Sequence, residues 1–242
     1  MALNAFLLAV QFLTRLPVRP EYSEAAMEAS PRFYPAAGVV VGGIGACVWM
    51  LAPWPPLVSA FVTLAVMVAL TGGLHEDGLA DTFDGLGGVR PKDRALEIMR
   101  DSRIGTYGVV ALVFSLALRG LGYAEVQALP WVLIAGAAAS RGAMVWAMAT
   151  STYARPSGAG SAVAGGIDAA TVRVAAGTVA LAWVPMVFVL PLAQVALAAL
   201  GLCLGAWVIR SWYMRRLGGY TGDCMGAVQQ AAEIGFILGL LA

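Results

Sequence analysis

The chain has 242 residues, of which 60% are hydrophobic and only 12% are charged, and its mean hydropathy is +0.79. A soluble globular fold does not usually carry so apolar a composition, which therefore predicts an integral membrane protein. The formal net charge of +1 carries no information about acidic or nucleic-acid partners.

The N-terminal segment, residues 1–14, is apolar and is followed by Arg15-Leu16-Pro17. It has neither the basic start nor the small-residue cleavage site of a secretory signal peptide. We expect an interfacial or re-entrant helix at this end of the chain.

Seven further segments are apolar over about 20 residues, the length that a helix needs to cross a bilayer. Prolines mark the turns within three pairs of these segments, at 53–56, 129–130 and 190–191. The sequence therefore predicts an all-α, polytopic membrane bundle of about seven transmembrane helices that forms one domain over residues 1–242. The predicted spans are about 33–52, 56–74, 108–126, 130–150, 172–190, 191–209 and 227–242.

Basic residues are distributed unevenly about these spans. The three proline-marked turns contain no Lys or Arg, whereas nearly all the basic residues lie in the segments at the other end. The positive-inside rule places the basic end in the cytoplasm. Glycines four residues apart also occur inside three spans and predict close helix packing, at Gly38 and Gly42, Gly201 and Gly205, and Gly235 and Gly239.

The stretch LHEDGLADTFDGL, residues 74–86, places four carboxylates and the only histidine of the chain directly after an apolar span. On a helix, Asp77, Asp81 and Asp84 lie within about 60° of one another and form one stripe. Three carboxylates on one face repel one another, and oxygen-rich clusters of this kind suit Mg²⁺ or Mn²⁺. The alternative is an acidic helix end that only faces water.

Residues next to this stripe are weaker candidates. Glu76 points about 100° away from the stripe, which makes it a less favourable metal ligand. His75 is a metal ligand, a proton acceptor or a structural residue at the helix start. We expect Gly78 and Gly85 to leave one flank of the helix open to a substrate.

A second group of candidate residues lies in the segment 91–108. Residues 91–103 have the pattern of an amphipathic interfacial helix, and the end of the segment, RDSRIGTYG, leads into the third span with two arginines, hydroxyl groups and two glycines. Because a helix N-terminus has free N–H groups and arginine binds phosphate oxygens in pairs, this end predicts a phosphate site. Metal ligands beside it suggest a diphosphate substrate. The alternative is a polar turn in which Asp101 or Ser102 caps the helix.

Three more polar residues stand out in the later part of the chain. Arg141 falls inside the fourth predicted span, where a charge is usually paired or functional. Asp168 precedes the fifth span and can cap it. Asp223, in the basic, glycine-rich segment 215–226, either caps the last helix or meets the Asp77 stripe.

Six segments of the chain resemble the cobalamin synthase family, the adenosylcobinamide-GDP ribazoletransferases. The resemblance runs nearly from end to end, and the joint presence of EDGLADTFDG, MRDSRIGTYG and TGD is highly specific. The matching segments are QFLTRLPV (11–18), FYPAAGVVVG (33–42), TGGLHEDGLADTFDG (71–85), RALEIMRDSRIGTYG (94–108), SRG (140–142) and GGYTGDCMGA (218–227).

This resemblance implies a membrane enzyme that joins adenosylcobinamide-GDP to α-ribazole, or to α-ribazole 5′-phosphate, and releases GMP. It also implies dependence on Mg²⁺ and a location in the bacterial inner membrane, with the active site facing the cytoplasm. The expected partners are these two substrates and the lipid bilayer, without a nucleic acid. The sequence leaves open whether the protein forms a homo-oligomer.

The resemblance also assigns roles to individual residues. It implies a metal site of Asp77, Asp81 and Asp84, with Glu76 adjacent and Asp101 from the second motif. Arg100 and Arg103 match the basic pair of the family and are expected to bind substrate and to act in catalysis. We favour Asp84 over His75 as the base for the attacking hydroxyl. The remaining expected substrate-binding residues are Thr106, Arg141, Thr221 and Asp223.

Two other function classes match the sequence less well. The CDP-alcohol phosphotransferases use an aspartate-rich motif for related chemistry, but here Leu74 occupies the position of its first Asp, and Asp81 a position of Ala. A cation transporter would carry its acidic residues near the middle of the membrane. In this chain most of them lie in the predicted cytoplasmic loops, with Glu125 and Glu233 the main exceptions.

Overall fold

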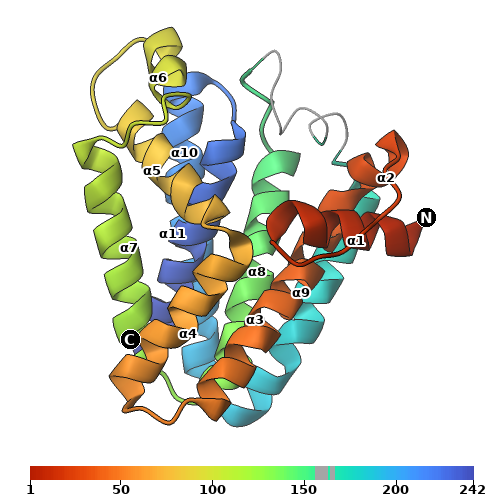
Figure 1. Ribbon diagram of the computed structural model, residues 1–242, viewed down its shortest axis with the longest axis vertical. Coiled ribbons are helices and arrows are strands. Elements are labelled where there is room, and N and C mark those ends of the chain that lie inside the picture. Colours follow the sequence, from red (N-terminus) through yellow and green to blue (C-terminus); the bar gives the residue numbers. More distant parts are fainter. Residues whose placement is uncertain (156–162, 164–166) are drawn as a thin grey trace.

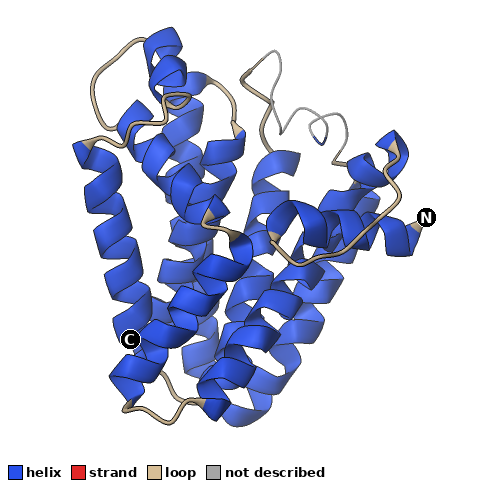
Figure 2. Ribbon diagram, viewed as in Figure 1, coloured by secondary structure: helices blue, strands red, loops and turns tan. Residues whose placement is uncertain are grey.

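The computed structural model describes residues 1–155, 163 and 167–242, and Figures 1 and 2 show how they are arranged. Within these residues every regular element is a helix, apart from a single β-bridge between Tyr153 and Tyr220. Six helical runs of the described chain are long and apolar enough to cross a membrane. They are Glu24–Leu51, which joins α2 (Glu24–Ala29), η1 (Ser30–Phe33) and α3 (Tyr34–Leu51), and then α7 (Thr106–Glu125), α8 (Leu129–Ala149), α9 (Ala169–Val189), α10 (Leu192–Leu217) and α11 (Gly222–Leu241).

The all-α, polytopic bundle predicted from the sequence is therefore confirmed, but one predicted span is broken. The segment 56–74 forms α4 (Pro56–Thr71), and after two residues the chain continues as α5 (Leu74–Leu86) at an angle of 86°. Gly72 and Gly73 make this bend with φ values of 64° and 69°, a left-handed conformation that side-chain-bearing residues rarely adopt. The acidic stretch thus starts a new helix and does not extend the span.

The N-terminal segment forms α1 (Ala2–Leu13), whose 12 residues are too few to cross a bilayer. In Figure 1 this helix lies across α3, and Phe12 stacks on Tyr34 of α3 with 6.1 Å between ring centroids. Beyond α1 the backbone N–H of Arg15 donates to the carbonyl of Leu70 at 2.7 Å. This bond fixes the N-terminal segment beside the bend between α4 and α5.

Two predicted boundaries are wrong by several residues. The sixth span was expected to end near residue 209, but α10 continues to Leu217 because Ile209, Tyr213 and Leu217 are buried at helical intervals of four. Consequently the segment between the sixth and seventh predicted spans, residues 210–226, is mostly helix. The amphipathic helix expected over 91–103 is α6 (Lys92–Ile98), so Asp101 lies in the loop that follows it.

The core of the bundle lies around α8 and α11, the most buried of the apolar helices, whereas α9 and α10 have mostly exposed sides. Close backbone contacts at glycines hold this core together, as the glycine pairs predict. A Cβ atom at Gly38 of α3 would lie 2.2 Å from the carbonyl oxygen of Ala137 in α8. Similarly, a Cβ atom at Gly201 of α10 would lie 2.1 Å from the carbonyl oxygen of Gly235 in α11.

The turns without basic residues and the connections that carry basic residues lie at opposite ends of the bundle, as the sequence predicts. The three turns without Lys or Arg, between α3 and α4, α7 and α8, and α9 and α10, gather at the lower end in Figure 1. The connections from α5 through α6 to α7 and from α10 to α11 lie at the upper end. The candidate site residues of the loops therefore share one end of the molecule.

Candidate functional site

A cleft of about 700 Å³ lies beside α5, between the Gly72–Gly73 bend and the loop that follows α6. It brings together the acidic stretch and the predicted phosphate segment, which the sequence could only suggest were close. Its charged and polar lining consists of Arg15, Asp77, Asp81, Arg100, Asp101 and Ser102. A larger cavity of about 890 Å³ between α8, α9 and α10 has an almost entirely apolar lining.

The acidic stripe is present on α5, and two of its three members face the cleft. Asp77 is exposed and Asp81 is half-buried. Asp81 is repelled by the carboxylates of Asp77, Asp84 and Asp223, so the first turn of α11 contributes a fourth carboxylate to this cluster. Asp223 therefore lies near the acidic stripe, which was one of the two alternatives that the sequence left open for this residue.

Asp223 reaches the stripe because α5 and α11 cross at very short range. A Cβ atom at Gly78 would lie 2.8 Å from the carbonyl oxygen of Asp223, and one at Gly226 would lie 3.0 Å from the carbonyl oxygen of His75. The expectation that Gly78 and Gly85 leave a flank open to substrate is therefore wrong. Their missing side chains make room for neighbouring segments, α11 at Gly78 and the α6 region at Gly85.

Asp84, the third member of the stripe, is buried and is engaged at the start of α7. Its two carboxylate oxygens accept hydrogen bonds from the backbone N–H groups of Gly105 at 2.7 Å and Gly108 at 2.9 Å. Asp84, a residue of α5, therefore caps α7. The alternative in the sequence analysis was a cap by Asp101 or Ser102. The same bonds occupy two N–H groups that were expected to be free for phosphate.

The arginines of the second motif point to different places. Arg100 lines the cleft, whereas the side chain of Arg103 is 87% exposed and lies outside its lining. The guanidinium of Arg103 donates to the carboxylate of Asp101 at 2.6 Å, and this contact lowers the pKa of Asp101 to about 2. Thr106, the first residue of α7, is exposed and is also outside the lining of the cleft.

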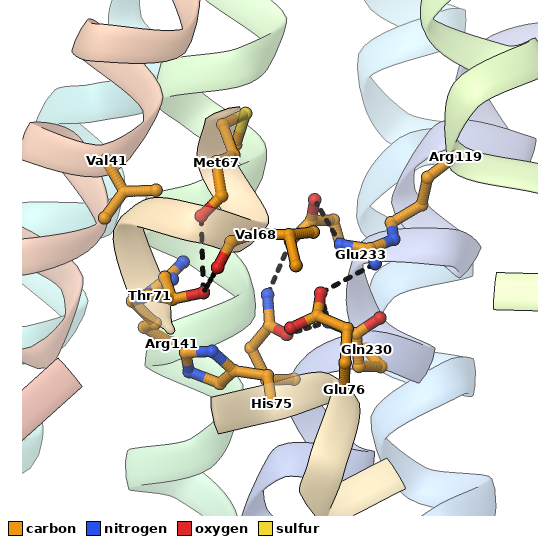
Figure 3. A pocket seen from close by; sticks show the side chains of 11 residues that line it. Val41, Met67, Val68, Thr71, His75, Glu76, Arg119, Arg141, Gln230 and Glu233 are labelled. Carbon is orange, nitrogen blue, oxygen red and sulfur yellow. Dashed lines mark hydrogen bonds and ion pairs between the residues drawn. The ribbon is translucent and has the colours of Figure 1, made fainter. Parts of the chain in front are cut away.

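His75 and Glu76 line a small polar pocket inside the bundle, which Figure 3 shows, and neither residue is in the lining of the cleft. The carboxylate of Glu76 forms an ion pair of 2.8 Å with Arg119 of α7 and accepts a hydrogen bond of 3.0 Å from Gln230 of α11. Both partners of the ion pair are almost fully buried. Arg141 lies in the same region, where its guanidinium donates to the carbonyl of Ala137 one turn earlier in α8.

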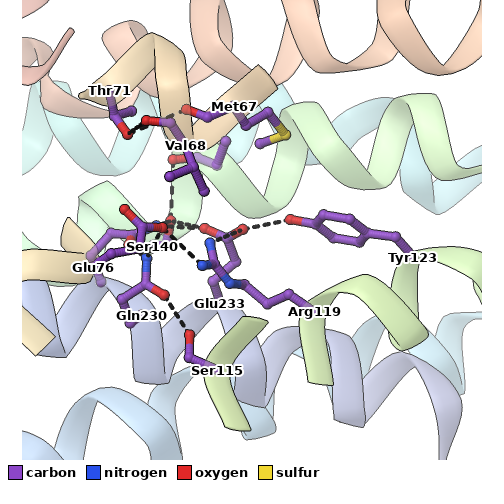
Figure 4. A network of polar contacts seen from close by, with 12 residues as sticks. Met67, Val68, Thr71, Glu76, Ser115, Arg119, Tyr123, Ser140, Gln230 and Glu233 are labelled. Atoms are coloured by element: carbon purple, nitrogen blue, oxygen red, sulfur yellow. Dashed lines mark hydrogen bonds and ion pairs between the residues drawn. The ribbon is translucent and has the colours of Figure 1, made fainter. Parts of the chain in front are cut away.

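This buried polar network extends to α11 (Figure 4). The carboxylate of Glu233 lies 3.7 Å from the guanidinium of Arg119 and accepts hydrogen bonds from the side chains of Tyr123 and Gln229. Arg119 therefore has two glutamates as ion-pair partners within the bundle. Arg119 is a functional candidate that was not predicted from the sequence, although an arginine inside an apolar span is a signal for a buried ion pair.

Side-chain contacts of Thr221 and Asp223 fix the start of α11. Thr221 is buried and caps α11 by accepting a hydrogen bond from the N–H of Cys224, so Asp223 is not the cap. The carboxylate of Asp223 instead pairs with Arg155 at 2.9 Å. Asp168 caps α9 through the N–H of Thr171 at 2.7 Å, as its position predicts.

Comparisons with known proteins agree with this architecture. The profile of the cobalamin-5-phosphate synthase family matches residues 5–241. An adenosylcobinamide-GDP ribazoletransferase of Leptothrix cholodnii is 43% identical over 98% of this chain and 94% of its own length. A protein of the same name from Vibrio parahaemolyticus is 35% identical over 99% of this chain and 92% of its own length. No solved structure matches the chain. The match over nearly the whole length shows that the chain belongs to the cobalamin-5-phosphate synthase family.

Proposed function

We propose that this protein joins adenosylcobinamide-GDP to α-ribazole, or to α-ribazole 5′-phosphate, and releases GMP. The observation that carries the proposal is the cleft beside α5, where the carboxylates of Asp77 and Asp81 face Arg100 and Ser102 of the second motif. Such a pairing of metal-competent acids with a phosphate-binding cation suits displacement at a diphosphate. The names of the relatives support the same reaction, and lipid head-group synthesis from a CDP-linked donor is not favoured.

We propose that Mg²⁺ binds in this cleft together with the diphosphate. Within the described residues no three acidic, histidine or cysteine side chains are arranged to hold a metal ion on their own. Mg²⁺ does not need such a site, because it is usually held by one or two carboxylates together with waters and substrate phosphates. Asp77 and Asp81 would be those carboxylates. When bound, the ion would neutralise charge on the phosphate oxygens.

The side chains of the cleft can carry the remaining roles in the transfer. In the reaction, a hydroxyl oxygen of ribazole forms a bond to the phosphorus next to cobinamide, and the bond from that phosphorus to the oxygen of GMP breaks. Arg100 is placed to bind the phosphate oxygens. A proton acceptor also has to reach the attacking hydroxyl. Neither Asp84 nor His75 lines the cleft, so a carboxylate oxygen of Asp77 or Asp81 that the metal leaves free is better placed for this role.

We also propose that the end of the bundle with the cleft faces the cytoplasm of a bacterial inner membrane. The basic residues gathered at that end support this orientation through the positive-inside rule. It would also give a nucleotide-linked substrate direct access to the cleft. Placing cysteine probes at the α5–α6 connection and at the α3–α4 turn, and labelling them in intact cells, tests the orientation.

The reaction is tested by measuring GMP release from the purified protein given adenosylcobinamide-GDP and α-ribazole. We expect release to require both ribazole and Mg²⁺, and to stop on addition of excess chelator. Asp81→Asn should abolish release without lowering thermal stability, while Glu97→Gln, a change in an exposed ion pair on α6, should leave it unchanged. Folded wild-type protein that releases no GMP under these conditions would contradict the proposed function.

A further inference from the structure

We propose that Arg15, in the segment after α1, binds a phosphate oxygen of the nucleotide-linked substrate from the wall of the cleft formed by the Gly72–Gly73 bend. This inference rests on the proposed function and adds a binding residue to it. Arg15 lines the same cleft as Asp77, Asp81 and Arg100 but comes from the other end of the sequence. The N-terminal segment would then be part of the active site as well as a membrane-associated helix.

Three hydrogen bonds hold the backbone around Arg15 in place. The hydroxyl of Thr14 donates to the carbonyl of Val10 at 2.7 Å, and the N–H of Leu16 donates to the same hydroxyl at 3.2 Å. The N–H of Arg15 itself donates to the carbonyl of Leu70 in the last turn of α4, at 2.7 Å. The side chain of Arg15 therefore starts from a fixed point beside the bend.

The side chain of Arg15 then passes directly over Gly72. A Cβ atom at Gly72 would lie 2.3 Å from Nε of Arg15 and 3.1 Å from its Cζ atom, so a side chain at this position would displace the arginine from its place over the bend. Gly72 also has a left-handed φ of 64°. The glycine thus serves two purposes, because it makes the bend between α4 and α5 and lets the guanidinium lie across it.

The guanidinium of Arg15 is available for a ligand. Within the described chain no carboxylate lies within 4 Å of it, although the cleft also contains Asp77 and Asp81. Arg103, by contrast, is already paired with Asp101. A planar guanidinium with unoccupied donors suits two oxygens of one phosphate. A phosphate of the substrate and a phosphate of a lipid head group share this chemistry, and the test separates them.

The test compares Arg15→Gln with the matched control Arg19→Gln, an exposed arginine of the same segment that lies outside the lining of the cleft. Steady-state GMP release is measured in maltoside micelles free of phospholipid, and Kd is measured for GDP with Mg²⁺. For Arg15→Gln we expect KM for the GDP-linked substrate and Kd for GDP to rise about 10-fold to 100-fold, the effect of one charge-assisted hydrogen bond. The value of kcat should change much less.

Further variants and conditions keep the outcomes distinct. Arg15→Lys should recover part of the affinity, because it keeps the charge but not the paired donors. Unchanged KM and Kd in folded Arg15→Gln, or an equal change in Arg19→Gln, would overturn the inference. An effect that appears only in vesicles containing phosphatidylglycerol would assign Arg15 to lipid head groups and would also overturn it. If wild-type protein releases no GMP, the proposed function fails, and GDP binding alone decides the role of Arg15.

Discussion

Replacing Glu76 by alanine should destabilise the protein without removing a metal ligand. Glu76 and Arg119 form an ion pair of 2.8 Å between side chains that are 11% and 4% exposed. Removing one partner of a buried pair typically costs about 3–5 kcal/mol, because the other charge stays buried without compensation. Glu233 lies 3.7 Å from Arg119 and can offset part of this cost, so we expect a loss near the lower limit, about 3 kcal/mol.

The assay is thermal unfolding of purified protein in detergent. For a chain of this size, a loss of about 3 kcal/mol corresponds to a Tm decrease of about 6–12 °C. The matched control is Glu97→Ala, which breaks an ion pair of 2.6 Å between exposed side chains on α6. Exposed pairs contribute at most about 1 kcal/mol, so its Tm should stay near the wild-type value.

The concentration of Mg²⁺ needed for half-maximal GMP release provides the second readout for Glu76. Below its own transition temperature, Glu76→Ala should need the same concentration as the wild type, because Glu76 is not in the lining of the cleft. Equal Tm values for Glu76→Ala and Glu97→Ala would refute the reasoning about the buried pair. A large increase in the required Mg²⁺ at unchanged Tm would show that Glu76 is a metal ligand.

Three more expectations follow from the site geometry. Asp84→Asn should lower the free energy of unfolding by about 1–2 kcal/mol, measured by chemical unfolding. The reason is that its carboxylate caps α7 by accepting hydrogen bonds from the N–H groups of Gly105 and Gly108. Gly226→Val should abolish GMP release and loosen α5 from α11, seen as faster amide exchange in α5, because its side chain would collide with the α5 backbone. Arg100→Gln should raise KM about 10-fold or more, whereas Arg103→Gln should raise it less, because Arg100 lines the cleft and Arg103 does not.

Local patterns in the sequence were sufficient to predict the class of the protein and most of its helices. Hydropathy over about 20 residues and the 3.6-residue period depend only on neighbouring residues, so they can be read without the fold. The stripe of Asp77 and Asp81 on α5 and the cap at Asp168 were predicted in this way. The uneven distribution of arginines likewise predicted which loops share one end of the bundle.

Tertiary structure decided what each polar side chain contacts. Asp84 belongs to the acidic stripe by spacing, yet the start of α7 lies against it and takes up both of its oxygens. Glu76, next to Asp77 in sequence, turns inward to Arg119. Helical spacing states which residues share a face, but it does not state which face meets the cleft and which meets another helix.

The sequence by itself therefore determined the membrane class, most of the apolar helices, the end that carries the charged loops and the family resemblance, because each of these is a property of local composition or of motifs. Only the tertiary structure brought Arg15 over Gly72 and Asp223 to the acidic stripe. These contacts depend on a sharp bend at Gly72–Gly73 and on close crossing of α5 and α11 at Gly78. They join segments far apart in the chain, whose approach is set by packing of the whole bundle and not by any local pattern.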